Sequence, residues 1–559
     1  MEPRPASGNL EPTPRATAGL VAALAVAASV TSLTNGFAFD DLAIIVGNDR
    51  VHDLHQWWRL FLTSYWPPSL GQSLYRPLTT LSLGIEWALG HGSPIPFRLT
   101  SIALYAVACV LTWHLLRRVT TPRSALIAAC LFAVHPVHVE AVANSVGQAE
   151  LLAAMAILAA SIVFVDGRRN DSLSTSRVLV IAALYAAGAL CKEHALLLPA
   201  LLLVLDRFSG RPRPWKERLR ELTPLGVTLL AVGSLILVAR LLVVGSLVGE
   251  KQVVEMNPST RIWMMFRVAP IWTRLMTFPA HLSAYYGPHD VEVVDGISVW
   301  SAVGILLFIG AAAFFVRSRT RHPAVALAIA WLAVTLFPSS NLLSGFIVEE
   351  HTLFVPSVGA ALLLGIGGAW LWARASRAYP EARRGMTPRT PLQLLVMATG
   401  VVVLALGLLR SAIRQPVWKD NRTLFAQTVL DAPRSYRAHY LYGTTLFEAG
   451  RLREGERELQ AAIALNEHDS DPFNYLATKY REAKVYHLAI PLYRRALALN
   501  AHRPDSRFGL AYSLFESGDV SGARAQADTG LAGGQLQGYF RWILARADSL
   551  PSREDKAKR

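Results

Sequence analysis

Cysteine and charge are both scarce in this sequence of 559 residues, and each shortage excludes a class of protein. The three cysteines, Cys109, Cys130 and Cys191, lie within or beside apolar runs, so a disulfide framework is not expected. Charged residues make up 17% of the chain, whereas soluble globular proteins carry roughly 25%. Together with a mean hydropathy of +0.32, this composition predicts a protein that crosses a membrane several times.

Several catalytic and nucleotide-binding motifs are also missing. The chain contains no P-loop, no G-x-G-x-x-G, no G-x-S-x-G and no C-x-x-C pattern. These absences argue against nucleotide-driven transport and against hydrolases of those kinds. The net charge of +15 does not indicate a nucleic-acid partner, because the arginines lie in short loops between apolar runs, where membrane topology explains them.

The apolar residues form runs that approach the ~20 residues needed to cross a bilayer. We predict about eleven spans of this kind, the first at 17–34 and the last near 391–409. The first run could be a cleaved signal peptide, but an uncleaved anchor is the better interpretation because many spans follow. Residues 1–16 are Pro-rich and basic, and we expect them to be disordered and cytoplasmic. A short basic tail, 546–559, ends the chain.

The basic loops all fall on one side of the membrane if the N-terminus is cytoplasmic, which is the positive-inside pattern. The unusual polar stretches then share the other face. They are FAFDD, YRPLTT, HPVHVEA, CKEH, the loop 245–296 and the segment 338–352. The same topology puts the C-terminal region on this face, which in a bacterial inner membrane is the periplasmic side.

The C-terminal region repeats with a period of 34 residues. Gly443, Ala477 and Ala511 mark one small-residue position of the repeat, and AIALN recurs as ALALN. This period and these small residues predict tetratricopeptide helix pairs that stack into an α-solenoid at 411–545, capped by a helix near 418–431. Such a solenoid offers a concave surface for an extended peptide, or it serves for packing and oligomerisation.

Asp40 and Asp41 follow the first apolar run directly. Two adjacent carboxylates at the exit of a membrane helix are costly to place there without a use for them. One of them could take a proton from an acceptor hydroxyl that attacks a sugar carbon, while the other raises its pKa or binds a metal. The alternative is that they mark the membrane interface and cap the next segment.

Basic residues on the predicted outer face are candidates for contact with a phosphate. Arg76 either binds phosphate or belongs to a turn, and Lys192 either binds phosphate or pairs with Glu193 to stabilise a bend. Three further arginines recur at helix-like spacing and either bind phosphate or extend to the membrane interface: Arg261, Arg267 and Arg274.

His135, His138 and Glu140 form a group that could bind a divalent metal. The two histidines would share a helix face, but Glu140 lies off that face and Pro136 breaks the helix. Polar contacts to substrate or to the acid pair are the alternative interpretation, and no metal is assigned. Glu350 and His351 lie where the chain enters the membrane, so a plain surface role suits them less well.

With these motifs laid out, the chain resembles the transmembrane and TPR-repeat-containing O-mannosyltransferases, within the GT-C glycosyltransferases. The resemblance rests on motifs that occur in the family's order: FAFDD, SLYRPLTTLS, FAVHPVHVEAVANSVGQAELLA, CKEHALLLPALLL, SSNLLSGFIVEEHTLFVPSVG and the repeats. It implies that the catalytic aspartate falls on Asp40 or Asp41. The family's glutamate–arginine pair falls on Glu350 and His351, and a neutral histidine is a poor substitute for arginine toward a phosphate.

The sequence therefore predicts an all-α protein with a GT-C membrane domain at 17–410 and a TPR domain. The resemblance implies transfer of a sugar, such as mannose, from a polyprenyl-phosphate donor to a Ser or Thr hydroxyl. A single displacement by one carboxylate-activated hydroxyl would invert the configuration of the sugar. In this interpretation Asp40 is the base, Asp41 orients it or binds a metal, and the TPR domain presents the acceptor protein. The alternatives are a membrane-anchored TPR adaptor without activity and a transporter of lipid-linked glycans.

Overall fold

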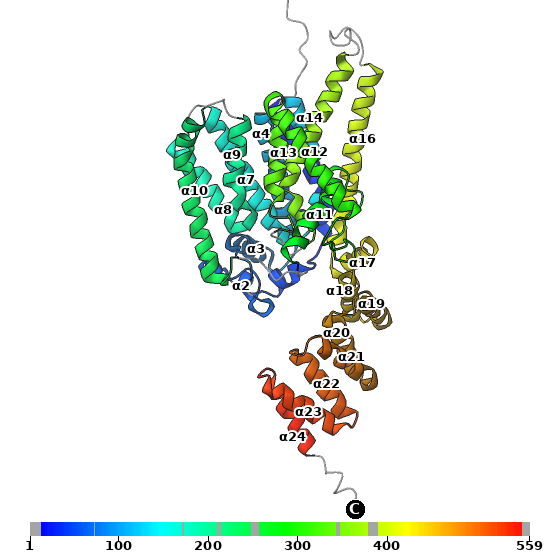
Figure 1. The fold of residues 1–559 in the computed structure, drawn as a ribbon. Helices are drawn as coiled ribbons and strands as arrows, with labels where there is room; N and C mark the ends of the chain where they lie inside the picture. Colours follow the sequence, from blue (N-terminus) through cyan, green and yellow to red (C-terminus); the bar gives the residue numbers. More distant parts are fainter. Residues whose placement is uncertain are drawn as a thin grey trace, which may run out of the picture. The chain divides into compact units, whose positions relative to one another are not determined.

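The computed structural model describes residues 13–71, 73–169, 173–209, 214–247, 256–342, 347–377 and 390–549 (Figure 1). Every regular element in these ranges is a helix, as predicted. The chain divides into two compact units, Met1–Leu424 and Phe425–Arg559. Most of the N-terminal segment 1–16 and of the tail 546–559 lies outside the described residues, so the expectations for these two segments are not addressed.

Among the described residues of the first unit, seven helical segments are long and apolar enough to cross a membrane. Their main helices are α1 (Pro14–Ser29), α4 (Ile95–Val119), α7 (Gln148–Arg169), α10 (Trp215–Val244), α12 (Val299–Arg321), α14 (Pro356–Arg377) and α16 (Pro391–Arg414). An eighth span is present if α5 (Pro122–Ala133) and the segment Pro136–Ala143, bent by 49°, count as one. The chain is thus an integral, multi-pass membrane protein, but the predicted number of about eleven spans is not confirmed.

The difference in span number comes from short and broken apolar segments. Three of the predicted spans are helices of only 12 to 17 residues: α8 (Thr175–Cys191), α9 (Leu198–Ser209) and α13 (Pro323–Leu336). A helix rises about 1.5 Å per residue, so 12 to 14 residues fall short of a hydrocarbon core of about 30 Å. Small residues allow close packing in this unit. A Cβ on Gly365 of α14 would lie 2.4 Å from the backbone oxygen of Ser124 in α5.

Short helices and turns lie at one end of the membrane unit, near α2 and α3 in Figure 1. They are the π-helical turn Leu42–Val46, α2 (Asp49–His52), the 3-10 segments Leu54–Leu62 and Pro68–Leu70, and α3 (Pro77–Gly90). The aromatic stretch 55–66 is mostly 3-10, with non-helical backbone at Gln56. It exposes Trp57 and Trp58 while it buries Leu60.

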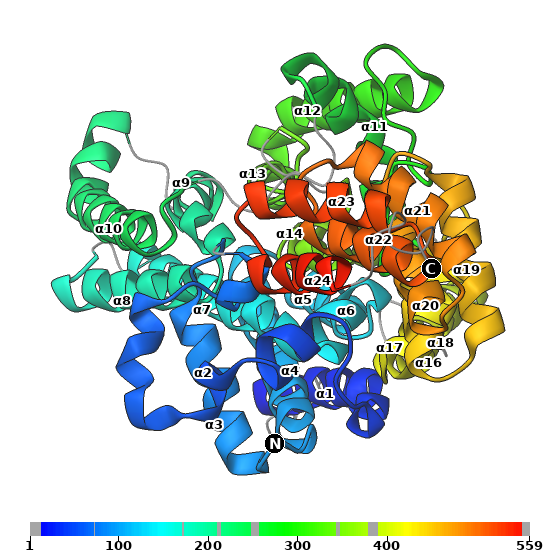
Figure 2. The ribbon, with the colours of Figure 1, turned by 90° about the horizontal axis from the view of Figure 1, so that it is seen from below.

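The remaining helices of the first unit connect these segments. They are α6 (Val139–Ala143), α11 (Pro258–Thr277) and the 3-10 turns Val30–Thr34, Pro136–His138, Ser145–Gly147, Glu193–Leu197, Glu350–Leu353 and Gln415–Trp418. Helix α7 packs against both α4 and α8, which lie on either side of it in Figure 2. The N-terminal end of α7 therefore meets both the turn that follows α8 and the first turn of α4, through Glu150 and Gln148.

The second unit consists of helix pairs that repeat every 34 residues. The first helices of successive pairs begin at Tyr436, Ser470 and Pro504. The helices are α18 (Tyr436–Glu448), α19 (Leu452–Leu465), α20 (Ser470–Glu482), α21 (Tyr486–Leu499), α22 (Pro504–Glu516), α23 (Val520–Ala532) and α24 (Gln537–Asp548). Gly443 is buried where α18 crosses α19, as the pattern of small residues indicated. The helix expected near 418–431 is α17 (Asn421–Asp431). Its role as a cap and the TPR assignment stay predictions.

Candidate functional site

The two acids of FAFDD differ in their surroundings. Phe39, just before them, has a φ of 55°, which residues other than glycine rarely adopt. Asp40 is half-buried, whereas the side chain of Asp41 is 1% exposed. The sharp turn at Phe39 therefore gives two adjacent carboxylates two different environments, one at the edge of the fold and one inside it.

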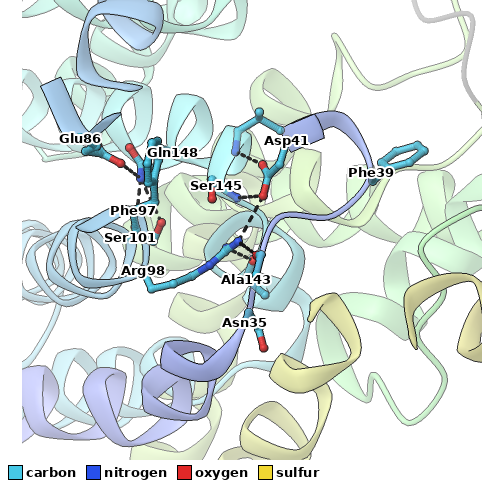
Figure 3. A network of polar contacts seen from close by, with 12 residues as sticks. Asn35, Phe39, Asp41, Glu86, Phe97, Arg98, Ser101, Ala143, Ser145 and Gln148 are labelled. Carbon is cyan, nitrogen blue, oxygen red and sulfur yellow. Dashed lines mark hydrogen bonds and ion pairs between the residues drawn. The ribbon is translucent and has the colours of Figure 1, made fainter. Parts of the chain in front are cut away.

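Asp41 is held by three donors (Figure 3). Its Oδ2 accepts hydrogen bonds from the guanidinium of Arg98 at 3.2 Å and from the backbone N–H of Ser145 at 3.2 Å. Its Oδ1 accepts from the N–H of Val146 at 2.9 Å. Burial raises the pKa of Asp41, while Arg98 and the two N–H groups oppose that shift. Both oxygens of Asp41 are thus occupied by the protein itself, which suits a residue that orients its neighbour Asp40.

Arg98 joins three segments of the chain around Asp41. Its side chain is fully buried, and it also donates to the carbonyl oxygens of Gly36 and Ala143. A buried guanidinium must have its charge and its N–H groups satisfied, so this clamp fixes the loop before Asp41 against the end of α6. Arg98 was not among the residues predicted from the sequence. A charged residue at the start of an apolar span was the signal that could have identified it.

A second buried polar pair lies beside this clamp (Figure 3). Gln148 donates from Nε2 to Oε2 of Glu86 at 2.8 Å, and it also lies within hydrogen-bond distance of the Phe97 carbonyl and the Ser101 hydroxyl. Burial raises the pKa of Glu86 to about 7, and the hydrogen bond from Gln148 opposes the shift. This pair fastens α3 to α4 and α7 behind the acid pair.

Arg76 lies at the same end of the unit and pairs with Glu193. Its Nε and Nη2 donate to Oε2 of Glu193 at 3.1 and 2.9 Å, and Arg240 donates to Oε1 at 3.0 Å. Burial alone would raise the pKa of Glu193, but Arg76 and Arg240 lower it to about 2. The Arg76 guanidinium also lies over the ring of Tyr65, 5.2 Å from its centroid. Glu193 is therefore ionised at physiological pH and is shared by two arginines.

Tyr65 connects this arginine pair to the acids. Burial raises the pKa of Tyr65 well above 10, Arg76 opposes the shift, and the charges of Asp40, Asp41 and Glu193 add to it. The Tyr65 ring belongs to the same buried cluster as Phe97 and Val146, and the N–H of Val146 donates to Asp41. Asp41 and Arg76 are thus linked through this cluster at the same end of the unit.

Lys192 and Glu193 do not form the ion pair that was one interpretation of CKEH. The Lys192 ammonium instead lies 2.9 Å from Oε2 of Glu150, and His194 lies 3.4 Å from Oε1 of the same carboxylate. The reason is the extended backbone of Lys192, with φ −155° and ψ 141°, which turns its side chain away from that of Glu193. The two neighbours therefore stabilise the turn through different partners.

The predicted metal group His135, His138 and Glu140 is divided among separate partners. His135 contacts the carbonyl of Met276 at 3.2 Å, and His138 contacts the hydroxyl of Ser357 at 2.8 Å. Within the described part of the chain, no three His, Cys, Asp or Glu side chains gather in a metal-binding arrangement. The interpretation of these three residues as one metal cluster does not fit this geometry.

Glu140 pairs with His351. The backbone N–H and the Nδ1 of His351 lie 3.0 and 2.9 Å from the two oxygens of Glu140. Burial alone would lower the pKa of His351, but the Glu140 carboxylate raises it above its ordinary value. The position where the resemblance implies an arginine is therefore bound to a carboxylate.

Glu350 has a different environment from its neighbour. It accepts hydrogen bonds from the Tyr286 hydroxyl at 2.5 Å and the Ser283 N–H at 2.7 Å. Burial raises the pKa of Glu350 to about 8, and the nearby Glu140 adds to the shift. Glu350 is thus largely protonated at neutral pH.

The arginines of α11 contact the segments around that helix. Arg261 donates to the carbonyls of Met256 and Asn341, at 3.2 and 2.9 Å, and Arg274 donates to the carbonyl of His281 at 2.9 Å. Burial lowers the pKa of Arg267, and Glu292 opposes that shift. A phosphate-binding role for these arginines stays a prediction.

Comparison with known proteins agrees with the resemblance seen in the sequence. Residues 77–239 match the family described as dolichyl-phosphate-mannose-protein mannosyltransferase. The chain is 27% identical to protein O-mannosyl-transferase TMTC3 of Mus musculus over 452 residues, which cover 73% of this chain and 46% of the relative. It is 27% identical to TMTC4 of Homo sapiens over 494 residues, which cover 77% of this chain and 64% of the relative.

The chain spans about half to two thirds of the length of these two relatives. Among solved structures, the oligosaccharyltransferase of Archaeoglobus fulgidus in its apo form aligns with 13% identity and a TM-score of 0.42, over 73% of this chain and 56% of that one. The predicted resemblance to the O-mannosyltransferases is confirmed by the family match and by the two O-mannosyl-transferase relatives.

Proposed function

We propose that the chain is a membrane glycosyltransferase that moves a sugar, mannose or a similar one, from a polyprenyl-phosphate donor to a hydroxyl acceptor. One observation carries the proposal: at one end of the membrane unit Asp41 accepts from the N–H of Val146, which belongs to the same buried cluster as Tyr65, and the Tyr65 ring lies under the Arg76 guanidinium. The similarity to protein O-mannosyltransferases supports it, and it suggests a Ser or Thr of an exported protein as acceptor.

The two acids have different roles, Asp41 in positioning and Asp40 in proton transfer. Asp41, anchored by Arg98 and two backbone N–H groups, holds the turn, and Asp40 faces the acceptor. As the acceptor oxygen attacks the anomeric carbon, Asp40 takes the hydroxyl proton. A new C–O bond forms, the bond from the anomeric carbon to the phosphate oxygen breaks, and the polyprenyl phosphate leaves with the electron pair. A single displacement of this kind inverts the configuration of the sugar.

The basic residues of the same end bind the donor phosphate. Lys192 and Arg76 are the members predicted from the sequence, and each is already close to a carboxylate, Glu150 or Glu193. We place this end on the outer face of the membrane, because Arg117 and Arg168 lie at the opposite ends of α4 and α7. The repeat unit would present the acceptor protein on the same side.

The test is sugar transfer by membranes that contain the full-length chain. A labelled polyprenyl-phosphate sugar is supplied, and protein-bound label is counted for the native chain, Asp40→Asn and Asp49→Asn. We expect Asp40→Asn to lower transfer by about 10² to 10⁴-fold, the usual contribution of a general base. Asp49, which is fully exposed nearby, is the matched control and should leave transfer unchanged. Full activity of Asp40→Asn would contradict the proposal.

A second candidate function is a membrane-anchored adaptor without catalytic activity. The pairing of His351 with Glu140 favours it, since the implied arginine is absent and its place is bound to a carboxylate. Complementation separates the two: an adaptor keeps its function in Asp40→Asn when that protein is present at native levels. A glycosyltransferase loses its function in that variant.

A further inference from the structure

A groove of about 770 Å³ lies along α12, which is found beside α11 at the edge of the membrane unit in Figure 2. Its first part is apolar and is lined by Ile309, Ala312, Ala313 and Val316, which recur every three or four positions and therefore share one face of the helix. This face is open, because α12 packs mainly against α11 and α13, and Ile309 and Val316 are 59% and 55% exposed. The two alanines leave the hollow between the larger side chains.

The other end of the groove is cationic. Arg317 and Arg321 lie about one helical turn apart and line the groove together with Thr320, whereas Arg319 of the same helix lies outside it. Among the residues that the structure describes, neither guanidinium has an ion-pair or hydrogen-bond partner. The chain also contains no acidic residue between Asp295 and Glu349, so this segment supplies no carboxylate of its own. The positive charge at this end of the groove is therefore available to an external anion.

The groove lies at the end of the membrane unit opposite to the acid pair. Phe315, two residues before Arg317, contacts Phe208 near the C-terminal end of α9, with ring centroids 5.7 Å apart. The ion pair of Arg168 and Asp206 joins that end of α9 to the C-terminal end of α7. The acid pair lies instead beside the N-terminal end of α7, and this helix of 22 residues is about 30 Å long. The groove is therefore separate from the site proposed for sugar transfer.

The length and polarity of the groove fit one lipid leaflet. The stripe from Ile309 to Arg321 covers 12 positions and rises about 18 Å, and half of a hydrocarbon core measures about 15 Å. Arginines at the end of an apolar helix extend to the level of the lipid headgroups. A water-soluble anion would contact only the arginines and leave the apolar part empty. An amphiphile with one anionic end fills both parts.

We infer that this groove binds an anionic phospholipid of the bilayer, with the headgroup phosphate between Arg317 and Arg321 and an acyl chain against Ala312 and Ala313. The guanidinium fork matches the oxygens of a phosphate, and the Thr320 hydroxyl adds a further donor. Basic sites beside membrane helices bind anionic headgroups in this way. The inference goes beyond the proposed function and does not depend on it, because such a lipid would cover α12 whether or not the chain transfers a sugar.

The experiment measures lipid binding by the full-length protein in detergent. Phosphatidylglycerol or the zwitterionic phosphatidylcholine is added, and bound lipid is measured by native mass spectrometry together with the shift in Tm. We expect phosphatidylglycerol to bind about tenfold more tightly than phosphatidylcholine. The double substitution Arg317→Gln and Arg321→Gln should weaken phosphatidylglycerol binding about tenfold, because each basic residue contributes to the attraction of an anionic headgroup. Arg319→Gln is the matched control on the same helix and should leave binding unchanged.

A second pair of substitutions tests the apolar part of the groove. Ala313→Leu fills the hollow without a change in charge and should weaken phosphatidylglycerol binding by about threefold or more, since it displaces the acyl chain. Ala311→Leu adds the same bulk at an exposed position outside the groove and should leave binding unchanged. All of these substitutions are at exposed residues, so the Tm without lipid should stay at the native value.

Several outcomes overturn the site. Native-like phosphatidylglycerol binding by the double arginine variant does so, and so does an equal loss in Arg319→Gln. If the double variant does not fold, the native protein decides: binding that is the same at about 0.1 M and about 1 M salt contradicts the headgroup contact. A dimer that Ala313→Leu separates, with no lipid bound, would mean that a second copy of the chain covers the groove.

Polyprenyl phosphate distinguishes this groove from the proposed donor site. Its binding should not change in the double arginine variant, because the acid pair and Arg76 lie at the other end of the membrane unit. An equal loss of polyprenyl phosphate and phosphatidylglycerol binding would overturn the assignment of the groove to a phospholipid of the bilayer.

Discussion

The two ends of α10 carry arginine clusters that differ in the burial of the carboxylate that two arginines share. At its N-terminal end, Arg168 and Arg218 both contact Asp206, and Arg168 also contacts Glu221, at 2.6 to 2.9 Å. At its C-terminal end, Arg76 and Arg240 contact opposite oxygens of Glu193. The side chain of Asp206 is 2% exposed, whereas that of Glu193 is 31% exposed. The buried carboxylate holds helices together, and the more exposed one is the one that a ligand can reach.

The largest effect is expected for Arg98, which is fully buried beside Asp41. Arg98→Gln removes the guanidinium from buried Asp41 and from two carbonyls. It should lower the free energy of unfolding by about 3 to 5 kcal/mol, the usual cost of breaking a buried pair. Chemical unfolding in detergent micelles, followed by tryptophan fluorescence, measures this. A loss below about 1 kcal/mol would show that the clamp is not structural.

A smaller loss of stability, about 3 kcal/mol, is expected for Arg168→Gln, which opens the cluster around Asp206. Asp206 keeps Arg218, but Asp206 and Glu221 both lose their contacts with Arg168. The folded fraction should still bind polyprenyl phosphate with native affinity, because this cluster has no part in the proposed donor site. Its exposed neighbour Arg169 provides the control, Arg169→Gln. Weaker lipid binding by folded Arg168→Gln would remove the distinction between the two clusters.

The pH dependence of stability tests the carboxyl group of Glu350, which accepts hydrogen bonds from Tyr286 and Ser283. Burial raises the pKa of Glu350 from 4.5 to about 8, so its neutral form favours the folded state. This contribution is complete below pH 4.5 and is lost as pH rises through about 8. The Tm of the native protein should therefore fall between pH 6 and 9, and that of Glu350→Gln should fall less. Glu349→Gln is the control, and equal slopes in all three proteins would contradict the assignment.

The smallest effect on stability is expected for Arg240→Gln. Glu193 keeps Arg76 and is 31% exposed, so the loss in the free energy of unfolding should be about 1 kcal/mol or less. The same unfolding assay compares this variant directly with Arg168→Gln. A loss as large as that of Arg168→Gln would mean that both clusters are structural and that the burial of the shared carboxylate does not separate them.

Local patterns predicted much of the fold. The 34-residue period gave the spacing of helix starts at Tyr436, Ser470 and Pro504, because period and small residues are local signals. The number of spans was harder to predict. Composition alone does not separate a short buried helix such as α9 from a true span, and Pro136 breaks another segment.

The partners of the candidate residues depend on the tertiary fold. Asp40, Asp41, Arg76 and Lys192 were selected because charge at the end of an apolar run is conspicuous. Arg76 meets Glu193 across 117 positions, however, while Lys192, next to Glu193 in the chain, points elsewhere because its backbone is extended. Sequence distance contains no information about such pairings. Arg98 and Arg240 were missed for another reason: each looks like an isolated interfacial arginine until its buried partners are known.

The most direct test of this account is a cryo-EM structure of the full-length protein with polyprenyl phosphate bound. The account predicts phosphate density beside the Arg76 guanidinium and the Lys192 ammonium, at the end of the membrane unit that holds Asp40 and Asp41. Phosphate density of that lipid at the opposite end, beside Arg168, would contradict it.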